Sequence, residues 1–188
     1  MPDTDWYEVS EGPKLAQGDV LFACPVFLPD KEMHWPIPAD SQLAIRVRLL
    51  DLVVVTQSCD LENDKVTDVL LAELISWPDI VRIELARGNT LIKSKEFRKK
   101  LIEGGVPGLS LFHRRDGTPS LPWSVVDFHN LFALPKGFAC QVAAAAGPRL
   151  RLRSPYREHL AQAFARYFMR VGLPHDAKAF EKEGEVKV

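Results

Sequence analysis

The residues best suited to chemistry lie in one short segment, 56–60, which follows an apolar run. Cys59 could act as a nucleophile if its thiol were deprotonated beside a base. Five histidines could supply that base: His34, His113, His129, His159 and His175. The alternative is a polar turn at a strand end, in which Ser58 and Asp60 bond the backbone and Cys59 is a small apolar side chain. Cys59 and Asp60 are therefore a candidate reactive site, and the polar turn is the commoner outcome for such a segment.

Three acidic residues at alternate positions raise the question of a metal site. Asp60, Glu62 and Asp64 could converge on a divalent cation if the segment were an extended loop. No glycine stands where an EF-hand loop requires one, and no pair of cysteines or histidines has the spacing of zinc ligands. We therefore predict no metal site and no cofactor.

The arginines near the C-terminus form a second chemically distinctive group. Arg149, Arg151 and Arg153 alternate with leucines, so on a strand they would share one face, and Arg157 follows them. Such a surface could hold phosphates or an acidic protein. Three hypotheses remain open, in this order of preference: pairing with the chain's own acidic residues in 51–80, binding of an acidic protein, and binding of RNA.

The long segment 28–42 is a candidate binding surface of another kind. It holds three prolines and shows little periodicity, which predicts a loop. Loops of this length in compact domains are usually functional or mobile. Trp35 lies within it, and tryptophan is enriched among the residues that anchor protein interfaces. We predict that Trp35 contacts a partner, and the alternative is that it folds back over the domain.

The composition describes one globular domain and restricts the classes of partner. The chain has 188 residues, 46% of them hydrophobic, and a net charge of only −1, which argues against bulk attraction to polyanions. Acidic and basic residues are nevertheless segregated along the chain, which favours a charged partner. No apolar run approaches the length of a membrane span, the N-terminus lacks signal-peptide features, and the three cysteines stand far apart. We predict a cytoplasmic protein without membrane contact.

Hydrophobic periodicity predicts a mainly β domain closed by a C-terminal amphipathic helix. Strands are expected at 20–27, 43–47, 49–56, 66–75, 109–113, 120–132, 138–145 and 149–153. The helix is expected to begin at Ser154 and to end at Gly172, and a weaker helix is expected at 93–103. These elements suggest a small SH3-like barrel. The domain is expected to span residues 1–174, with 175–188 as a flexible charged tail.

Several of these segments resemble the PemK/MazF toxin family. Residues 17–21 (QGDVL) resemble its first strand, 52–63 its next strand and loop, and 66–72 (VTDVLLA) the strand after that. The order of elements is similar over 17–174. Separately, the motifs VVVTQSCDL and FARYFMRVGLP are similar to those of a group of bacterial proteins of unassigned activity that we associate with defence gene neighbourhoods.

The family resemblance implies an SH3-like barrel with metal-independent endoribonuclease activity. In the family an arginine stabilises charge on the phosphate and a neighbouring group handles the proton of the 2′-hydroxyl. That arginine precedes the valine-rich strand, where this chain instead has Asp51, and the nearest arginines are Arg46 and Arg48. Thr67 lies near the position of the family's threonine.

Two functional hypotheses follow from this resemblance and from the presence of Asp51 where the family has its arginine. The leading one is a non-catalytic interaction module of a bacterial defence or toxin–antitoxin-like system, which binds another protein encoded nearby. The alternative is a divergent endoribonuclease, with RNA as its partner, that uses these side chains: Arg46 or Arg48 with Thr56, Ser58 or Thr67. Convergence of an arginine and a hydroxyl in an open groove would favour the enzyme. A thiol or metal enzyme centred on Cys59 and Asp60 is a third hypothesis, and the family resemblance also implies a homodimer.

Overall fold

The computed structural model describes residues 5–40, 42 and 44–169 and confirms that the domain is mainly β. Seven strands are present in this part of the chain, with bounds β1 (Tyr7–Ser10), β2 (Val20–Pro29), β3 (Ile45–Val54), β4 (Asp68–Ser76), β5 (Leu109–Phe112), β6 (Ser124–Pro135) and β7 (Arg149–Leu152). The helices are α1 (Ser58–Glu62), α2 (Trp77–Ala86), α3 (Lys95–Ile102), α4 (Lys136–Ala146) and α5 (Tyr156–Phe168), with a short 3₁₀ turn, η1 (Thr90–Lys93). The predicted tail 175–188 and the predicted helix end at Gly172 lie outside the described residues.

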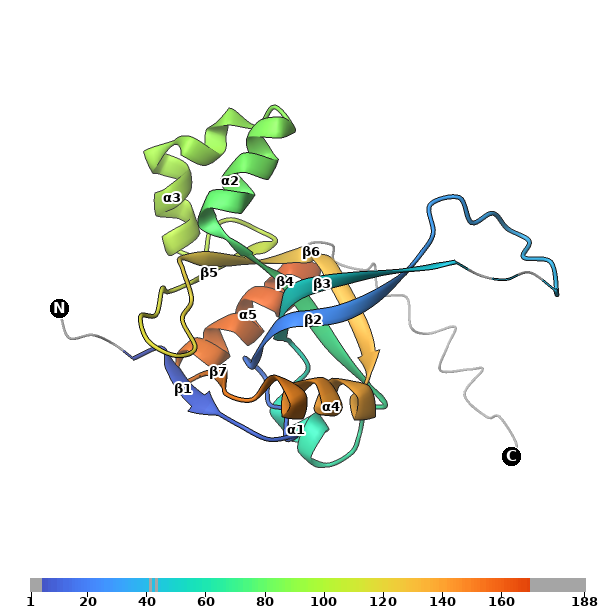
Figure 1. The fold of residues 1–188 in the computed structure, drawn as a ribbon. Helices are drawn as coiled ribbons and strands as arrows, with labels where there is room; N and C mark the ends of the chain where they lie inside the picture. Colours follow the sequence, from blue (N-terminus) through green and yellow to red (C-terminus); the bar gives the residue numbers. More distant parts are fainter. Residues whose placement is uncertain (1–4, 41, 43, 170–188) are drawn as a thin grey trace, which may run out of the picture.

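The strands form two antiparallel sheets (Figure 1). The larger sheet has the order β2-β3-β4-β6-β5, and the smaller one pairs β1 with β7. An isolated bridge between Asp19 and Arg151 connects the start of β2 to β7. The larger sheet thus has β2 and β5 as its edges, and the described strands do not close into a barrel.

The larger sheet is covered differently on its two faces. On one face, α5 and the β1–β7 sheet enclose a core that includes Val53, Ala72 and Leu160. The opposite face carries two separate groups, because α4 and α1 pack on Leu52 and Leu71 at one end while α2 and α3 pack near Val125 at the other. We call residues 77–102 the helical lobe. Figure 1 shows this lobe standing at one end of the sheet, away from α4.

Strands β2 and β3 extend beyond the rest of the sheet. Antiparallel pairing continues to Pro29 and Ile45, whereas β3 pairs with β4 only through residues 52–54. The outer halves of the two strands therefore form a two-stranded ribbon that projects from the domain (Figure 1). We call residues 25–29 and 45–49 the arm. Part of the segment predicted as a loop at 28–42 is thus strand, and the separate strands predicted at 43–47 and 49–56 are one continuous strand.

The prediction of a strand at 138–145 is wrong, since this segment lies within helix α4. Ala139 and Ala143 are buried at a spacing of four, which is the period of a helix face, and alanine has the highest helix propensity. The C-terminal helix is confirmed, although α5 begins at Tyr156 and Ser154 makes no N-cap bond. The weaker helix expected at 93–103 corresponds to α3.

Candidate functional site

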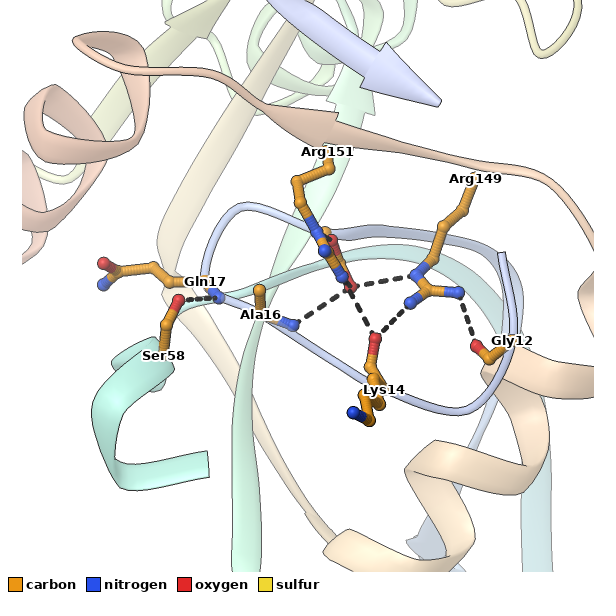
Figure 2. A network of polar contacts seen from close by, with 8 residues as sticks. Gly12, Lys14, Ala16, Gln17, Ser58, Arg149 and Arg151 are labelled. Carbon is orange, nitrogen blue, oxygen red and sulfur yellow. Dashed lines mark hydrogen bonds and ion pairs between the residues drawn. The ribbon is translucent and has the colours of Figure 1, made fainter. Parts of the chain in front are cut away.

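The predicted reactive segment 56–60 serves mainly to join elements of the fold. Thr56 Oγ1 accepts a 2.7 Å hydrogen bond from the backbone N–H of Leu70. Ser58 begins helix α1, and its Oγ accepts a 3.0 Å bond from the backbone N–H of Gln17 (Figure 2). Both hydroxyls therefore have backbone partners. For Ser58 this is the bond that the polar-turn hypothesis expects, whereas the Asp60 carboxylate contacts the side chains of Cys59 and Lys65.

Cys59 is exposed on α1, and its surroundings do not form a catalytic pair. Its Sγ lies 3.7 Å from Gln57 Oε1 and 3.8 Å from Asp60 Oδ1, and no histidine is among its hydrogen-bond partners in the described part of the chain. Asp60 lies 4.0 Å from Lys65 Nζ. The hydrogen-bond geometry of Cys59 thus lacks the imidazole base that a thiol–histidine catalytic pair requires.

The three acidic residues that follow do not converge. Asp64 bonds Lys136, whose ammonium group holds the pKa of this carboxyl below its usual value. No three histidine, cysteine or acidic side chains gather in an arrangement that could hold a metal ion among the described residues. Thr67, the remaining predicted hydroxyl, lies just before β4 and donates to Asp68 Oδ2 at 3.1 Å.

Two of the predicted binding arginines are used inside the fold. Arg149 is only 1% exposed, and its Nε donates to Asp19 Oδ2 at 2.9 Å. It also donates to the carbonyl oxygens of Gly12 and Lys14 (Figure 2). Arg151 Nη2 donates to the same Asp19 oxygen at 2.8 Å. Arg149 therefore has no surface to offer a partner, and the pair instead fixes the segment 12–19 against β7.

Arg153 and Arg157 remain at the surface. Arg153 Nη1 lies 3.2 Å from Asp5, and Arg157 Nη2 lies 3.0 Å from Glu158. The arginines therefore pair internally, as the preferred hypothesis held, but their partners lie in the N-terminal segment and α5 rather than in residues 51–80.

The structure separates the predicted ribonuclease arginines from the predicted hydroxyls. Arg46 lies on the arm, where it donates to Pro29 O at 3.3 Å. Arg48 lies 4.0 Å from Glu73 on β4. From Arg46 and Arg48 to Val54, where β3 ends before Thr56, eight and six steps of extended strand span roughly 26 Å and 20 Å. The arginine–hydroxyl pairs named from the sequence do not converge.

The arm presents an apolar face that no sequence pattern had singled out. Register places Pro25, Phe27 and Pro29 opposite Leu49, Val47 and Ile45, so all six share one face. The larger side chains are 51–66% exposed: Phe27, Ile45, Val47 and Leu49. Trp35, in the loop that joins the two strands, is 87% exposed. This face is the largest set of exposed apolar side chains on neighbouring strands in the described residues.

A polar cluster at a bulge in β6 is the second candidate site. Ala72 pairs with Leu131 and the next residue, Glu73, pairs with Asp127, so three residues of β6 (128–130) have no counterpart on β4. Bulges of this kind redirect side chains and are common beside functional sites. Asp127 Oδ1 lies 2.7 Å from His129 Nδ1, and its Oδ2 accepts a 3.2 Å bond from the Asn130 side chain.

The ring of His129 is held in one orientation. Gly108 approaches it so closely that a Cβ at this glycine would lie 2.3 Å from the His129 Cε1. The ring of Tyr167 meets it edge-to-face, with centroids 5.1 Å apart. Asp127 orients Nδ1, and His129 lines a cavity of about 380 Å³ between β6 and the helical lobe, which Glu84 also lines. An imidazole oriented in this way can transfer protons.

Glu73 extends the cluster toward the arm. Burial raises the pKa of its carboxyl, the charge of Asp127 raises it further, and Arg48 lowers it. The sequence suggests a role for His129 only as a base for Cys59. The signal available in the sequence was the motif Asp127-x-His129-Asn130 within a strand, but its convergence depends on the bulge, which the sequence pattern does not reveal.

The comparisons with known proteins find no relative, since no family model matches the chain and no curated protein matches it. Within the described part of the chain, none of the helices is long and apolar enough to cross a membrane.

Proposed function

We propose that this protein is a non-catalytic interaction module of a bacterial defence or toxin–antitoxin-like system, and that its arm binds another protein encoded nearby. The observation that carries the proposal is the exposed apolar face of Phe27, Ile45, Val47 and Leu49. Trp35 would extend the contact beyond the strands, as a large aromatic anchor. The module would act in the cytoplasm.

The energetics of the arm favour a docking role. Full burial of a large apolar side chain contributes roughly 1.5–3 kcal/mol, so completing the burial of four half-exposed ones would contribute about 3–6 kcal/mol before the costs of association. Among the described residues, nothing pairs with the outer edge of β3 along the arm, because β4 pairs only with residues 52–54. Proteins normally protect such an edge. A partner that covers the apolar face or pairs with the edge would remove both liabilities.

The proposal includes a common ancestry with the PemK/MazF family. We place the chain as a divergent relative of PemK/MazF toxins, with two sheets where the family has a closed SH3-like barrel. The antiparallel succession β2-β3-β4 and the C-terminal α5 support this placement. Asp51 stands where the family has its arginine, and its carboxylate accepts a hydrogen bond from the backbone of Ala23 at 2.9 Å. An acidic residue at that position would repel phosphate, which supports loss of the ancestral activity.

The test uses purified proteins encoded by the adjacent genes. Each is measured by biolayer interferometry against the parent protein and against the arm variants Val47→Asp and Leu49→Asp. Leu91→Asp is the matched control, because Leu91 is at least as exposed as the two arm residues (71%) but lies on η1. We expect at least tenfold weaker binding for each arm variant and no change for the control.

Two outcomes would contradict the proposal. One is that no neighbouring gene product binds, or that the arm variants bind as tightly as the parent. The other is that light scattering shows a dimer of the parent that the arm variants abolish, which would assign the arm to a homodimer.

A metal-independent endoribonuclease is the second candidate function, favoured by the cluster that links Arg48 to His129 through Glu73, Asn130 and Asp127. In such a reaction the 2′-oxygen bonds phosphorus, the bond to the 5′-oxygen breaks, His129 takes the 2′-hydroxyl proton and water protonates the leaving oxygen. Arg48 would offset the charge on the phosphate.

The assay is incubation of mixed-sequence RNA without metal. Cleavage that His129→Ala and Arg48→Ala abolish and Arg46→Ala spares would establish the enzyme and refute the non-catalytic proposal. Intact RNA with the parent protein would exclude this candidate.

A further inference from the structure

The free edge of the larger sheet at β5 lies in a groove. Phe128 N donates to Gly108 O, so alternation along the antiparallel ladder turns the backbone groups of Ser110 and Phe112 toward β6. The N–H and C=O groups of Leu109 and Leu111 therefore point away from the sheet. Leu109 N bonds Val106 O at 3.3 Å, but the outward groups of Leu111 have no hydrogen-bond partner elsewhere in the described chain, and neither has the carbonyl of Leu109.

The groove has apolar walls on both sides of this edge. A cavity of about 510 Å³ runs along β5, with Ile102 at the end of α3 on one side and Leu160 and Ala163 of α5 on the other. A second cavity of about 230 Å³ adjoins it and is lined almost entirely by apolar atoms, including those of Trp77 and Trp123. An extended chain lying along β5 would direct alternate side chains toward these two walls.

The charges around the groove are mainly positive. Arg98 lines the smaller cavity and makes no ion pair with any described residue. Arg166 lines the larger one, and its Nε donates to the carbonyl oxygen of Gln162 rather than to a carboxylate. Glu103 is the one carboxylate among the described residues that line these two cavities, and it lies 3.9 Å from Lys99. Arg98 and Arg166 thus have no ion-pair partner among the described residues.

We propose that this groove binds an extended segment of a partner protein, which adds as a sixth strand beside β5 with apolar residues at alternate positions flanked by acidic residues. Main-chain bonds to Leu111 supply affinity, and the cavity between Trp77 and Trp123 selects an apolar side chain. Arg98 and Arg166 select the acidic flanks. The groove lies on the opposite edge of the sheet from the arm, so this inference does not depend on the role proposed for the arm.

The test selects a displayed library of random ten-residue peptides on the full chain and, in parallel, on the Ile102→Glu variant. Ile102 is 72% exposed and lines both cavities, so the substitution places a repelling carboxylate in the groove without removing buried contacts. Leu91→Glu is the matched control, since Leu91 is 71% exposed on the same lobe but outside the groove. We expect enriched peptides with apolar residues at alternate positions and acidic flanks, which bind at least tenfold more weakly to Ile102→Glu and unchanged to Leu91→Glu.

Backbone pairing is tested separately from apolar contact. The best peptide, N-methylated at alternate residues, is expected to lose binding, and the unmodified peptide is expected to slow hydrogen exchange of the Leu111 amide. Enrichment that is equal on Ile102→Glu, or binding that survives N-methylation on either alternate set, would overturn the proposal. So would a Leu111 amide already protected in the free protein, which would assign the groove to the chain itself, or self-association that Ile102→Glu abolishes, which would assign it to a second copy.

Discussion

Replacing Asp19 with alanine tests whether the buried ion triad holds the N-terminal segment in place. Asp19 is fully buried, and its carboxylate accepts bonds from Arg149, Arg151 and the backbone N–H of Ala16. The variant leaves Arg149 buried and charged, with only the carbonyl oxygens of Gly12 and Lys14 as partners. A charge left without its counter-ion in the interior is the costly outcome of breaking such a pair.

The expected loss is about 3–5 kcal/mol in the free energy of unfolding, since one partner of a buried pair is removed. Asp5→Ala is the matched control: it removes the carboxylate beside Arg153, but both side chains are at least half exposed, so the expected loss is below about 1 kcal/mol. The double variant Asp19→Ala/Arg149→Met removes the unpaired buried charge and keeps an apolar side chain of similar length. It is expected to recover most of the loss.

Urea unfolding at pH 7, followed by the fluorescence of the four tryptophans, measures all three variants. A loss for Asp19→Ala within about 1 kcal/mol of that for Asp5→Ala would refute the reasoning, because it would show that Arg149 finds solvent or another partner without cost. A double variant as unstable as the single one would refute the claim that the unpaired charge is the cause.

Three further predictions concern the β6 bulge and the arm. Gly108→Ala places a Cβ 2.3 Å from the His129 ring at a backbone φ of +85°, so we expect about 1–3 kcal/mol of destabilisation, together with a shifted His129 resonance in NMR spectra. Burial raises the pKa of Glu73, so the folded state holds this proton more tightly than the unfolded state, and its contribution to stability falls as pH rises above the ordinary value of 4.5. Glu73→Gln should therefore gain stability relative to the parent as pH rises from 4.5 to 7 in chemical unfolding, and a constant difference would contradict this assignment. Val47→Asp should change the free energy of unfolding by no more than about 0.5 kcal/mol, because Val47 is 57% exposed, and a larger loss would show that the arm packs on the domain.

Local sequence patterns predicted the elements whose signal is contained within a few residues. The alternation of leucines with arginines at 149–153 predicted a strand, and β7 confirms it. Leu150 and Leu152 are buried in the core. The apolar stripe of α5 was equally clear, and Leu160 lies at its buried centre. The segment 138–145 failed because a short continuous apolar run has the same appearance in a strand and in a buried helix.

The candidate site depended on contacts between distant parts of the chain, which the patterns do not contain. Arg149 is buried because it meets Asp19, which lies 130 positions earlier. His129 is oriented by a register shift between β4 and β6 and by the close approach of Gly108, neither of which has a composition signal. The distance between Arg46 and Thr56 follows from one continuous strand where two had been predicted.

The continuous pairing of the arm has a consequence for how the protein can diversify. Side chains alternate along both strands, so inserting two residues into each strand would lengthen the apolar face by one rung and leave its orientation unchanged. A single insertion would turn the outer residues to the opposite side. Because the arm pairs with no other strand in the described part of the chain, such changes would leave the register of the rest of the sheet unaltered. The arm can thus change its length in steps of two while the domain beneath it stays the same.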